Sequence, residues 1–212
     1  METKNTKSLW NLSAWKLKDI ILGSLIAVLF AFICFGTVHL MFFTVIPMLA
    51  PIGLGDIPIE FVFGMFFMSA VFAPYIIRKP GVALVVGTMT GLIQVLMGSA
   101  FGTVVVSALV QGLGAELAFA SMGYRKYNWK TVLLAALGAT ITSFILAYFR
   151  GAWDNVAFWV VGLRFTIRLL SALLFSGIIV KLLADRLAKA GVLKSYPIGE
   201  KYIGNLDIED NE

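Results

Sequence analysis

Residues 19–46 read DIILGSLIAVLFAFICFGTVHLMFFTVI, a stretch with a single charged side chain, that of Asp19. A run of roughly 20 apolar residues is long enough to cross the hydrocarbon of a bilayer as an α-helix. A helix also satisfies its own backbone hydrogen bonds there. The stretch is too long for a signal peptide and lacks a small-residue cleavage site, so it predicts a retained membrane-spanning helix.

Five more apolar segments follow, at about residues 58–77, 81–98, 103–122, 130–149 and 158–185. The chain has 59% hydrophobic residues, 14% charged residues and a mean hydropathy of +0.90, which excludes an ordinary soluble domain. We therefore predict an all-α integral membrane protein, a bundle of six transmembrane helices. Its membrane domain covers residues 19–186, between an N-terminal segment, 1–18, and a C-terminal tail, 187–212.

Basic residues indicate the orientation of this bundle. Fourteen lysines and arginines lie before the first span, between spans two and three, between spans four and five, and at the end of the chain. The alternate loops, 47–57, 98–102 and 151–157, contain none. The positive-inside rule then predicts that both termini are cytoplasmic. The net charge of +5 follows from topology and lipid contact, so it does not indicate a nucleic-acid partner.

Small residues spaced by four indicate where helices pack closely. Ala135 and Ala139 on the fifth expected helix, like similar residues on the third, favour packing inside the bundle. Ala27 and Ala31 on the first helix fit either internal packing or contact with a partner. The first outer loop, 47–57, is rich in proline and glycine and is either a lid or a plain connector.

Charged side chains inside a bilayer usually face a cavity or a partner, because burying them is costly. Counting along the expected helices places Glu116 and Arg168 at a similar depth, with Arg164 one turn above Arg168. We therefore predict an ion pair between Glu116 and Arg168 whose role is mainly structural.

Carboxylate, amide, imidazole and indole groups concentrate in the outer half of the predicted bundle. Such groups among apolar and aromatic walls are typical of a small-molecule pocket. The candidate substrate-binding residues are His39, Glu60, Gln94, Gln111, Glu116, Trp153, Phe158 and Trp159. Two alternatives remain open: His39 is also compatible with simple packing, and the two tryptophans with an interfacial aromatic belt.

Several chemical signatures are missing from the sequence. It has no phosphate-binding G-x-x-x-x-G-K-[ST] loop, so we expect no ATP hydrolysis by this chain. It has neither H-E-x-x-H nor G-x-S-x-G, and one histidine with one cysteine, Cys34, builds no usual metal site. We expect no cofactor and no enzymatic activity. A membrane enzyme, a self-sufficient carrier or channel, and a scaffolding protein remain alternatives, although the two halves show no repeat typical of carriers.

Four short runs resemble one family. They are IRKPGVAL at 77–84, VQGLGAE at 110–116, IRLLS at 167–171 and GVL at 191–193. In this order they are similar to the YkoE family, the substrate-binding S components of energy-coupling factor (ECF) transporters. The resemblance implies a subunit in the plasma membrane of a prokaryote that captures thiamine, or its hydroxymethylpyrimidine precursor, from outside. A transmembrane T subunit and two cytoplasmic ATPase subunits would drive uptake.

The resemblance also implies roles for particular residues. S components often contact the T subunit through an A-x-x-x-A face on the first helix, a pattern met here by Ala27 and Ala31. Glu60 and Glu116 stand where the family tends to carry carboxylates, whereas Gly87 and Gln94 stand where relatives often carry them on the third helix. Losing these acidic groups favours a neutral pyrimidine over a cationic thiazolium, and a different small vitamin also remains open.

Overall fold

The computed structural model describes residues 15–52, 57–152, 154 and 156–200, without the side chain of Ile52. Within these ranges the regular structure is helical throughout, with no strand. In chain order the elements are α1 (Leu17–Leu40), η2 (Met41–Val45), α2 (Ile46–Leu49), η3 (Ala50–Ile52), α3 (Ile57–Phe66), α4 (Met68–Ile77), α5 (Val82–Leu96), α6 (Phe101–Ser121), α7 (Trp129–Phe149), α8 (Phe158–Ala172), η4 (Leu173–Ile179) and α9 (Val180–Lys189).

Five helical stretches in the described chain are long and apolar enough to cross a membrane. They are Leu17–Leu49, Ile57–Ile77, Phe101–Ser121, Trp129–Phe149 and Phe158–Lys189. The remaining predicted segment, 81–98, forms α5, a shorter apolar helix of 15 residues. The prediction of an all-helical membrane protein is therefore confirmed. Residues 1–14, most of the predicted N-terminal segment, and residues 201–212, the last part of the predicted C-terminal tail, lie outside the described chain.

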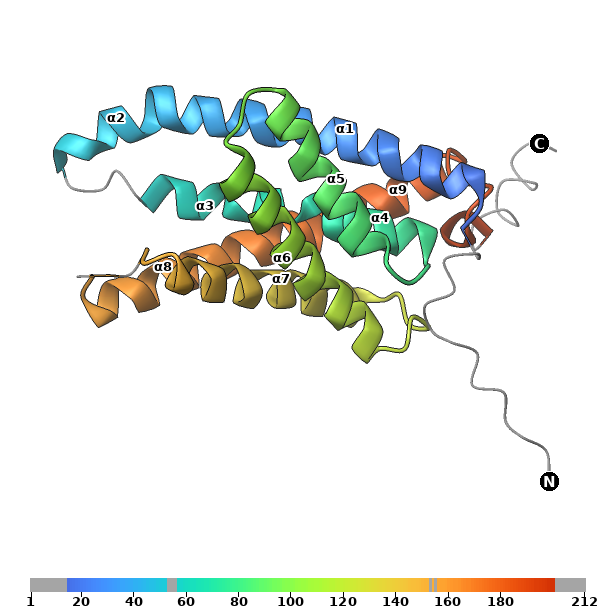
Figure 1. Cartoon of the computed structure of the whole chain (residues 1–212). Helices are drawn as coiled ribbons and strands as arrows, with labels where there is room; N and C mark the ends of the chain where they lie inside the picture. Colours follow the sequence, from blue (N-terminus) through green and yellow to red (C-terminus); the bar gives the residue numbers. More distant parts are fainter. Residues whose placement is uncertain (1–14, 53–56, 153, 155, 201–212) are drawn as a thin grey trace.

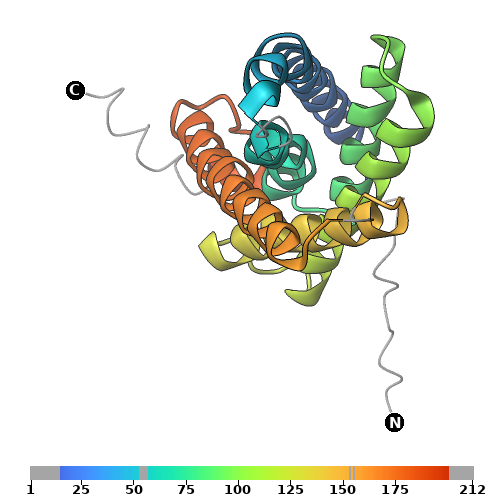
Figure 2. The same ribbon diagram turned by 90° about the vertical axis from the view of Figure 1, so that its left-hand side faces the viewer.

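The helix formed by α3 and α4 lies at the centre of the bundle, with α1, α5 to α7 and α8 around it (Figures 1 and 2). Every residue of α4 is buried. The start of α1 and the end of α9 lie together at one end, here called the terminal end (Figure 1). The starts of α3 and α8, with α2, lie at the opposite end.

The first helix runs further than the sequence predicts. It continues past residue 46 through α2, which contains Pro47. A π-helical turn, η2, precedes this proline, and the Ile46 N–H donates to the Met41 carbonyl five residues back. Such a turn changes the i−4 geometry with which a proline ring clashes. The helix therefore accommodates Pro47 instead of ending at it. Residues 53–56 of the expected lid or connector lie outside the described chain.

The small residues of α1 face inward. Ala27 and Ala31 have no exposed surface, and a Cβ added at Gly23 would lie 3.1 Å from Val86 of α5. The pair therefore contributes to close packing inside the bundle and offers no surface to a partner. Their burial speaks against a docking face for the T subunit at these two alanines, because a partner cannot reach them.

The closest approach between α3 and α8 occurs at Gly64. A Cβ at this position would lie 2.3 Å from the Ser171 carbonyl oxygen. The Gly64 N–H donates to the Ser171 hydroxyl over 3.0 Å, and Ser176 of η4 donates to the Gly64 carbonyl over 2.6 Å. Ser171 also donates to the Phe61 carbonyl. The two helices run parallel. Hydrogen bonds join them at a separation that only a residue without a Cβ allows.

An ion pair lies one turn from this contact. Arg168 Nε and Nη2 donate to the two carboxylate oxygens of Glu60 over 2.6 and 2.8 Å, and both residues are 3% exposed. Arg168 Nη1 donates to Ser143 of α7 over 2.9 Å, and the guanidinium lies 3.8 Å from the centre of the Phe63 ring. The predicted pair of Arg168 with Glu116 is wrong, because α3 brings Glu60 alongside α8 while Glu116 binds backbone N–H groups at the start of α5.

Replacing Gly64 tests the close approach. We expect Gly64→Ala to lower the free energy of unfolding by about 1–3 kcal/mol, because its Cβ overlaps backbone atoms of α8. The matched control is Gly36→Ala on α1, where nothing lies within 4 Å of an added Cβ. The control should be neutral or gain up to about 1 kcal/mol from helix propensity. Thermal unfolding in detergent measures both, and equal stability of the two variants would contradict the packing described.

Removing one partner of the ion pair tests its burial. We expect Glu60→Ala to cost about 3–5 kcal/mol of stability, because the Arg168 guanidinium is left without its buried counter-charge. A double variant, Glu60→Met with Arg168→Met, should recover most of this loss, since no charge then remains to be buried. Thermal unfolding of both variants checks this, and a double variant less stable than Glu60→Ala would count against the interpretation.

Candidate functional site

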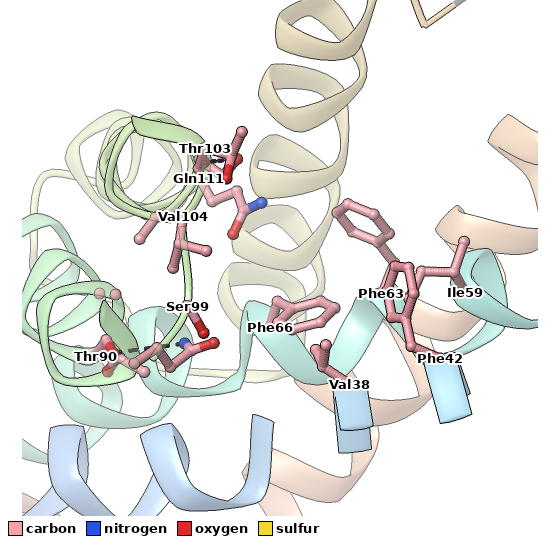
Figure 3. Close-up of a pocket in the computed structure, with 15 residues that line it drawn as sticks. Val38, Phe42, Ile59, Phe63, Phe66, Thr90, Ser99, Thr103, Val104 and Gln111 are labelled. Carbon is pink, nitrogen blue, oxygen red and sulfur yellow. Dashed lines mark hydrogen bonds between the residues drawn. The ribbon is translucent and has the colours of Figure 1, made fainter. Parts of the chain in front are cut away.

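A cavity of about 210 Å³ opens between α1, α3, α5 and α6 (Figure 3). Phenylalanines from α1's extension and α3 (Phe42, Phe63 and Phe66) form one wall. Gln111 of α6 lies across the cavity from these rings (Figure 3). Gln94 of α5 also lines the cavity. None of the described residues that line this cavity is charged. Planar aromatic faces opposite amide groups hold a flat ligand and offer it hydrogen bonds.

The polar wall comes from residues spaced by four. On α6, Thr103, Ser107 and Gln111 all line the cavity because positions i, i+4 and i+8 share one face of a helix. Gln94 Nε2 makes only a long contact, 3.5 Å, with the Thr90 carbonyl on the turn before. The Gln111 side chain makes no hydrogen bond within the described chain, although it is only 6% exposed. These amides are therefore available to a ligand.

Two small residues allow α5 to approach α6 behind this wall. A Cβ added at Gly91 would lie 2.5 Å from the Ala108 Cβ, and one at Gly87 would lie 3.5 Å from the Gly112 Cα. Both glycines line the cavity. Close backbone approach through small residues is how helices associate within a bilayer. The glycines therefore hold the two amide-bearing helices together and leave space beside Gln94 and Gln111.

A second, charged cavity of about 240 Å³ adjoins the first. The two share Phe63, Ser107 and Gln111 as lining residues. The charged residues that line the second cavity are Glu60, Arg150, Arg164 and Arg168. Arg150 Nη1 donates to the Ser107 hydroxyl over 2.9 Å. Among the described lining residues, an uncharged set and a set with three arginines and one carboxylate therefore meet at Gln111.

Three of the predicted site residues come together here. Glu60 lines the second cavity, Gln94 the first, and Gln111 both. His39 is exposed, with Nδ1 2.9 Å from the Phe35 carbonyl oxygen, and it lines neither cavity.

The predicted aromatic residues lie elsewhere. Phe158 and Trp159 are 92% and 71% exposed at the start of α8, which fits a position in lipid or at its interface. Trp153 lies outside the described residues. The described aromatic wall is instead formed by phenylalanines of α3 and η2.

Glu116 also lies away from both cavities, at the start of α5. Its carboxylate accepts hydrogen bonds from the N–H groups of Gly81 over 2.6 Å and Ala83 over 2.9 Å. An acidic group at a helix N-terminus binds its unpaired N–H groups and complements the helix dipole. Gly81 has a φ of 83°, a left-handed conformation that glycine adopts readily. Glu116 is therefore a helix cap that joins α6 to α5.

Tyr124 completes this cap. Its hydroxyl donates to Glu116 over 2.7 Å. Burial raises the pKa of the Tyr124 phenol above its ordinary value, and the hydrogen bond to the Glu116 carboxylate raises it further. The phenol therefore stays protonated and keeps donating across the physiological pH range.

Sequence reasoning missed most of the cavity walls. The spacing of Thr103, Ser107 and Gln111 on an otherwise apolar helix is a signal that was available. Phe63 and Phe66 gave no such signal, because phenylalanines occur throughout these apolar segments. Arg150 directly precedes the expected outer loop 151–157, and only the packing of α6 beside α7 brings it to Ser107.

Comparisons with known proteins agree with this architecture. Residues 18–142 match the family model described as the permease component of an ABC-type cobalt transport system. The chain is 34% identical over 191 residues to the HMP/thiamine permease protein YkoE of Bacillus subtilis (strain 168). The alignment covers 90% of this chain and 93% of YkoE. A crystal structure of an S component of an ECF transporter superposes with a TM-score of 0.83 and 31% identity, covering 93% of this chain and 98% of that one.

The matches extend over nearly the whole chain and include the helices that form both cavities. They are to transport subunits, and the described chain has helices of the length and apolarity that such membrane subunits need. The chain belongs to the YkoE family of ECF-transporter S components.

Proposed function

We propose that this chain is the subunit of an ECF importer that captures a thiamine-related compound, and that the cavity between Gln94, Gln111 and the phenylalanines is its binding site. The observation that carries the proposal is this pairing of amides with aromatic faces in an uncharged cavity. A pyrimidine ring is flat, stacks on aromatic side chains and exchanges hydrogen bonds with amides. The relative named as an HMP/thiamine permease supports this substrate class.

The charges favour the pyrimidine precursor over thiamine itself. A ligand with a second ring would extend from the first cavity past Gln111 into the second. There it would meet three arginines and one carboxylate, and both oxygens of that carboxylate already bind Arg168. A cationic thiazolium is repelled by the Arg150 guanidinium, which donates to two neutral groups, the Ser107 hydroxyl and the Thr103 carbonyl. A neutral hydroxymethylpyrimidine fills the first cavity without this cost.

The distribution of basic residues supports one orientation in the membrane. We propose that α5 is a sixth, short span, that the terminal end with residues 1–18 and 187–212 is cytoplasmic, and that the bundle crosses the plasma membrane of a prokaryote. Basic loops at the terminal end support this orientation through the positive-inside rule. Both cavities then lie toward the outer side, accessible to an external vitamin.

Energy would come from partner subunits. The sequence contains no phosphate-binding loop, and the family to which the chain belongs serves ECF transporters. We therefore propose assembly with a transmembrane T subunit and two ATPase subunits that drive release inside. Because Ala27 and Ala31 are buried, the partner surface on α1 would be its outward face, which includes Leu25, Leu29 and Phe32.

Calorimetric titration of the purified full-length protein tests the substrate. We expect saturable one-site binding of hydroxymethylpyrimidine, and binding of thiamine weaker by about tenfold or more, which corresponds to about 1.4 kcal/mol of charge repulsion. Tighter binding of thiamine would contradict the charge argument while leaving the site in place. No binding of either compound would contradict the proposed substrate class and favour a different vitamin or nutrient.

Replacing Gln94 tests the site. We expect Gln94→Ala to weaken hydroxymethylpyrimidine binding about 5–10-fold, because one hydrogen bond of about 1–1.5 kcal/mol is lost. Thr88→Ala is the matched control on the same helix, since its hydroxyl bonds to the Leu84 carbonyl one turn back and does not line the cavity. Calorimetric titration of both variants with hydroxymethylpyrimidine measures the two affinities. Equal affinities would show that the ligand does not contact Gln94.

A further inference from the structure

A third cavity, of about 310 Å³, lies at the terminal end, at the other end of the bundle from the proposed vitamin site. It is formed where α4 ends, α7 begins and α9 passes. Its polar and aromatic lining residues include Tyr75, Arg78, Tyr127, Trp129, Lys181 and Asp185. Neither the proposed capture of a vitamin nor the helix cap at Glu116 uses this cavity.

The charges of this cavity do not balance. Asp185 is already engaged twice, by an ion pair with Lys181 and by the Tyr75 hydroxyl, which donates over 2.9 Å. Lys181 also lies 4.7 Å from the centre of the Trp129 ring. Arg78 therefore brings a positive charge to the cavity that no carboxylate among the described lining residues neutralises.

Arg78 occupies a strained position. It ends α4 with φ 56° and ψ 43°, a left-handed conformation usually taken by glycine at the end of a helix. A residue with a Cβ is disfavoured in this conformation. Strain of this kind often accompanies function. Its guanidinium lies 5.1 Å from the centre of the Tyr127 ring, so the strained backbone places a cation beside an aromatic wall of the cavity.

Two residues that line this cavity each carry a buried donor without an acceptor. Arg78 Nε and the Tyr127 hydroxyl have no hydrogen-bond partner in the described chain. Arg78 Nη1 makes one long bond, 3.4 Å, to the Pro197 carbonyl. Burial raises the pKa of the Tyr127 phenol, so its hydroxyl stays protonated and can donate. A buried donor without a partner costs stability, and a ligand that only accepts hydrogen bonds removes that cost.

We propose that this cavity binds a phosphate group through Arg78 and the Tyr127 hydroxyl. Arginine binds phosphate oxygens with charge-assisted hydrogen bonds, and an anion also balances the excess charge. Trp129, which lines the cavity and is 42% exposed at the start of α7, is the kind of residue found at the level of lipid headgroups. The phosphate is that of an anionic phospholipid or of a small soluble anion, and the two sources share this chemistry.

Thermal unfolding of the delipidated full-length protein tests the site. The additions are phosphatidylglycerol, a neutral diacyl glycolipid without phosphate, and inorganic phosphate. We expect phosphatidylglycerol to raise the unfolding temperature saturably and the glycolipid to do so less. A matching response to inorganic phosphate would support the site and assign a soluble anion, whereas a response to phosphatidylglycerol alone would assign the lipid. No response to either phosphate compound would overturn the proposal.

Three variants separate the site from diffuse surface charge. Arg78→Gln should weaken the response about tenfold, measured as the concentration of the phosphate compound that gives half of the maximal rise in unfolding temperature. Tyr127→Phe should weaken it several-fold without lowering the unfolding temperature of the ligand-free protein, because it removes only a buried hydroxyl that has no partner. Lys130→Gln removes one exposed charge near the cavity and should keep the wild-type response. An equal loss in Lys130→Gln and Arg78→Gln would overturn the proposal, as would a wild-type response in Tyr127→Phe.

Discussion

The contact between α3 and α8 is the interaction on which the rest of the structure depends. Within a bilayer, lipid tails are as apolar as side chains, so no hydrophobic force drives one helix against another. This protein uses a bidentate pair, Glu60 with Arg168, and a glycine contact at Gly64 one turn away. Together they hold α3 at the centre of the bundle. Because Phe63 and Phe66 are carried on the same helix, the contact also positions the aromatic wall of the first cavity.

A second contact, between α5 and α6 at the terminal end, gives a structural role to two of the sequence runs that resemble the family. Glu116, in the run 110–116, caps the helix that begins within the run 77–84. A Cβ added at Gly112 would lie 3.1 Å from the Ala83 carbonyl oxygen, so the two runs also touch through their backbones. The family signature at these positions is therefore mainly a requirement of folding. Gln111, beside the cap residues in sequence, is the part of the signature that faces a ligand cavity.

Hydropathy predicted the helices because it measures a local property, the cost of exposing or burying each segment in lipid. It could not predict which helices are neighbours. Glu116 and Arg168 were matched by depth alone, but pairing also requires adjacent helices, and α8 lies beside α3. The same limit applies to Ala27 and Ala31, whose spacing indicates close packing without saying against what. Gln94 and Gln111, which the sequence predicts to bind substrate, both line the first cavity. Polar side chains on apolar helices are few enough to single out such positions.

The placement of charge gives the proposed site its selectivity. Every charged residue of the described part of the chain that lines the two adjoining cavities lines the second one, and the buried carboxylate there is already bound at both oxygens to Arg168. Using Glu60 to recognise a cationic ligand would require breaking that pair and leaving a guanidinium buried alone, which costs several kcal/mol, about 3–5. The Gln94 and Gln111 amides need no such exchange, since neither is engaged by more than a long contact. In the proposed function, such a site would recognise the hydrogen-bonding edge of a neutral ring, and the ion pair beside it would hold the walls in place.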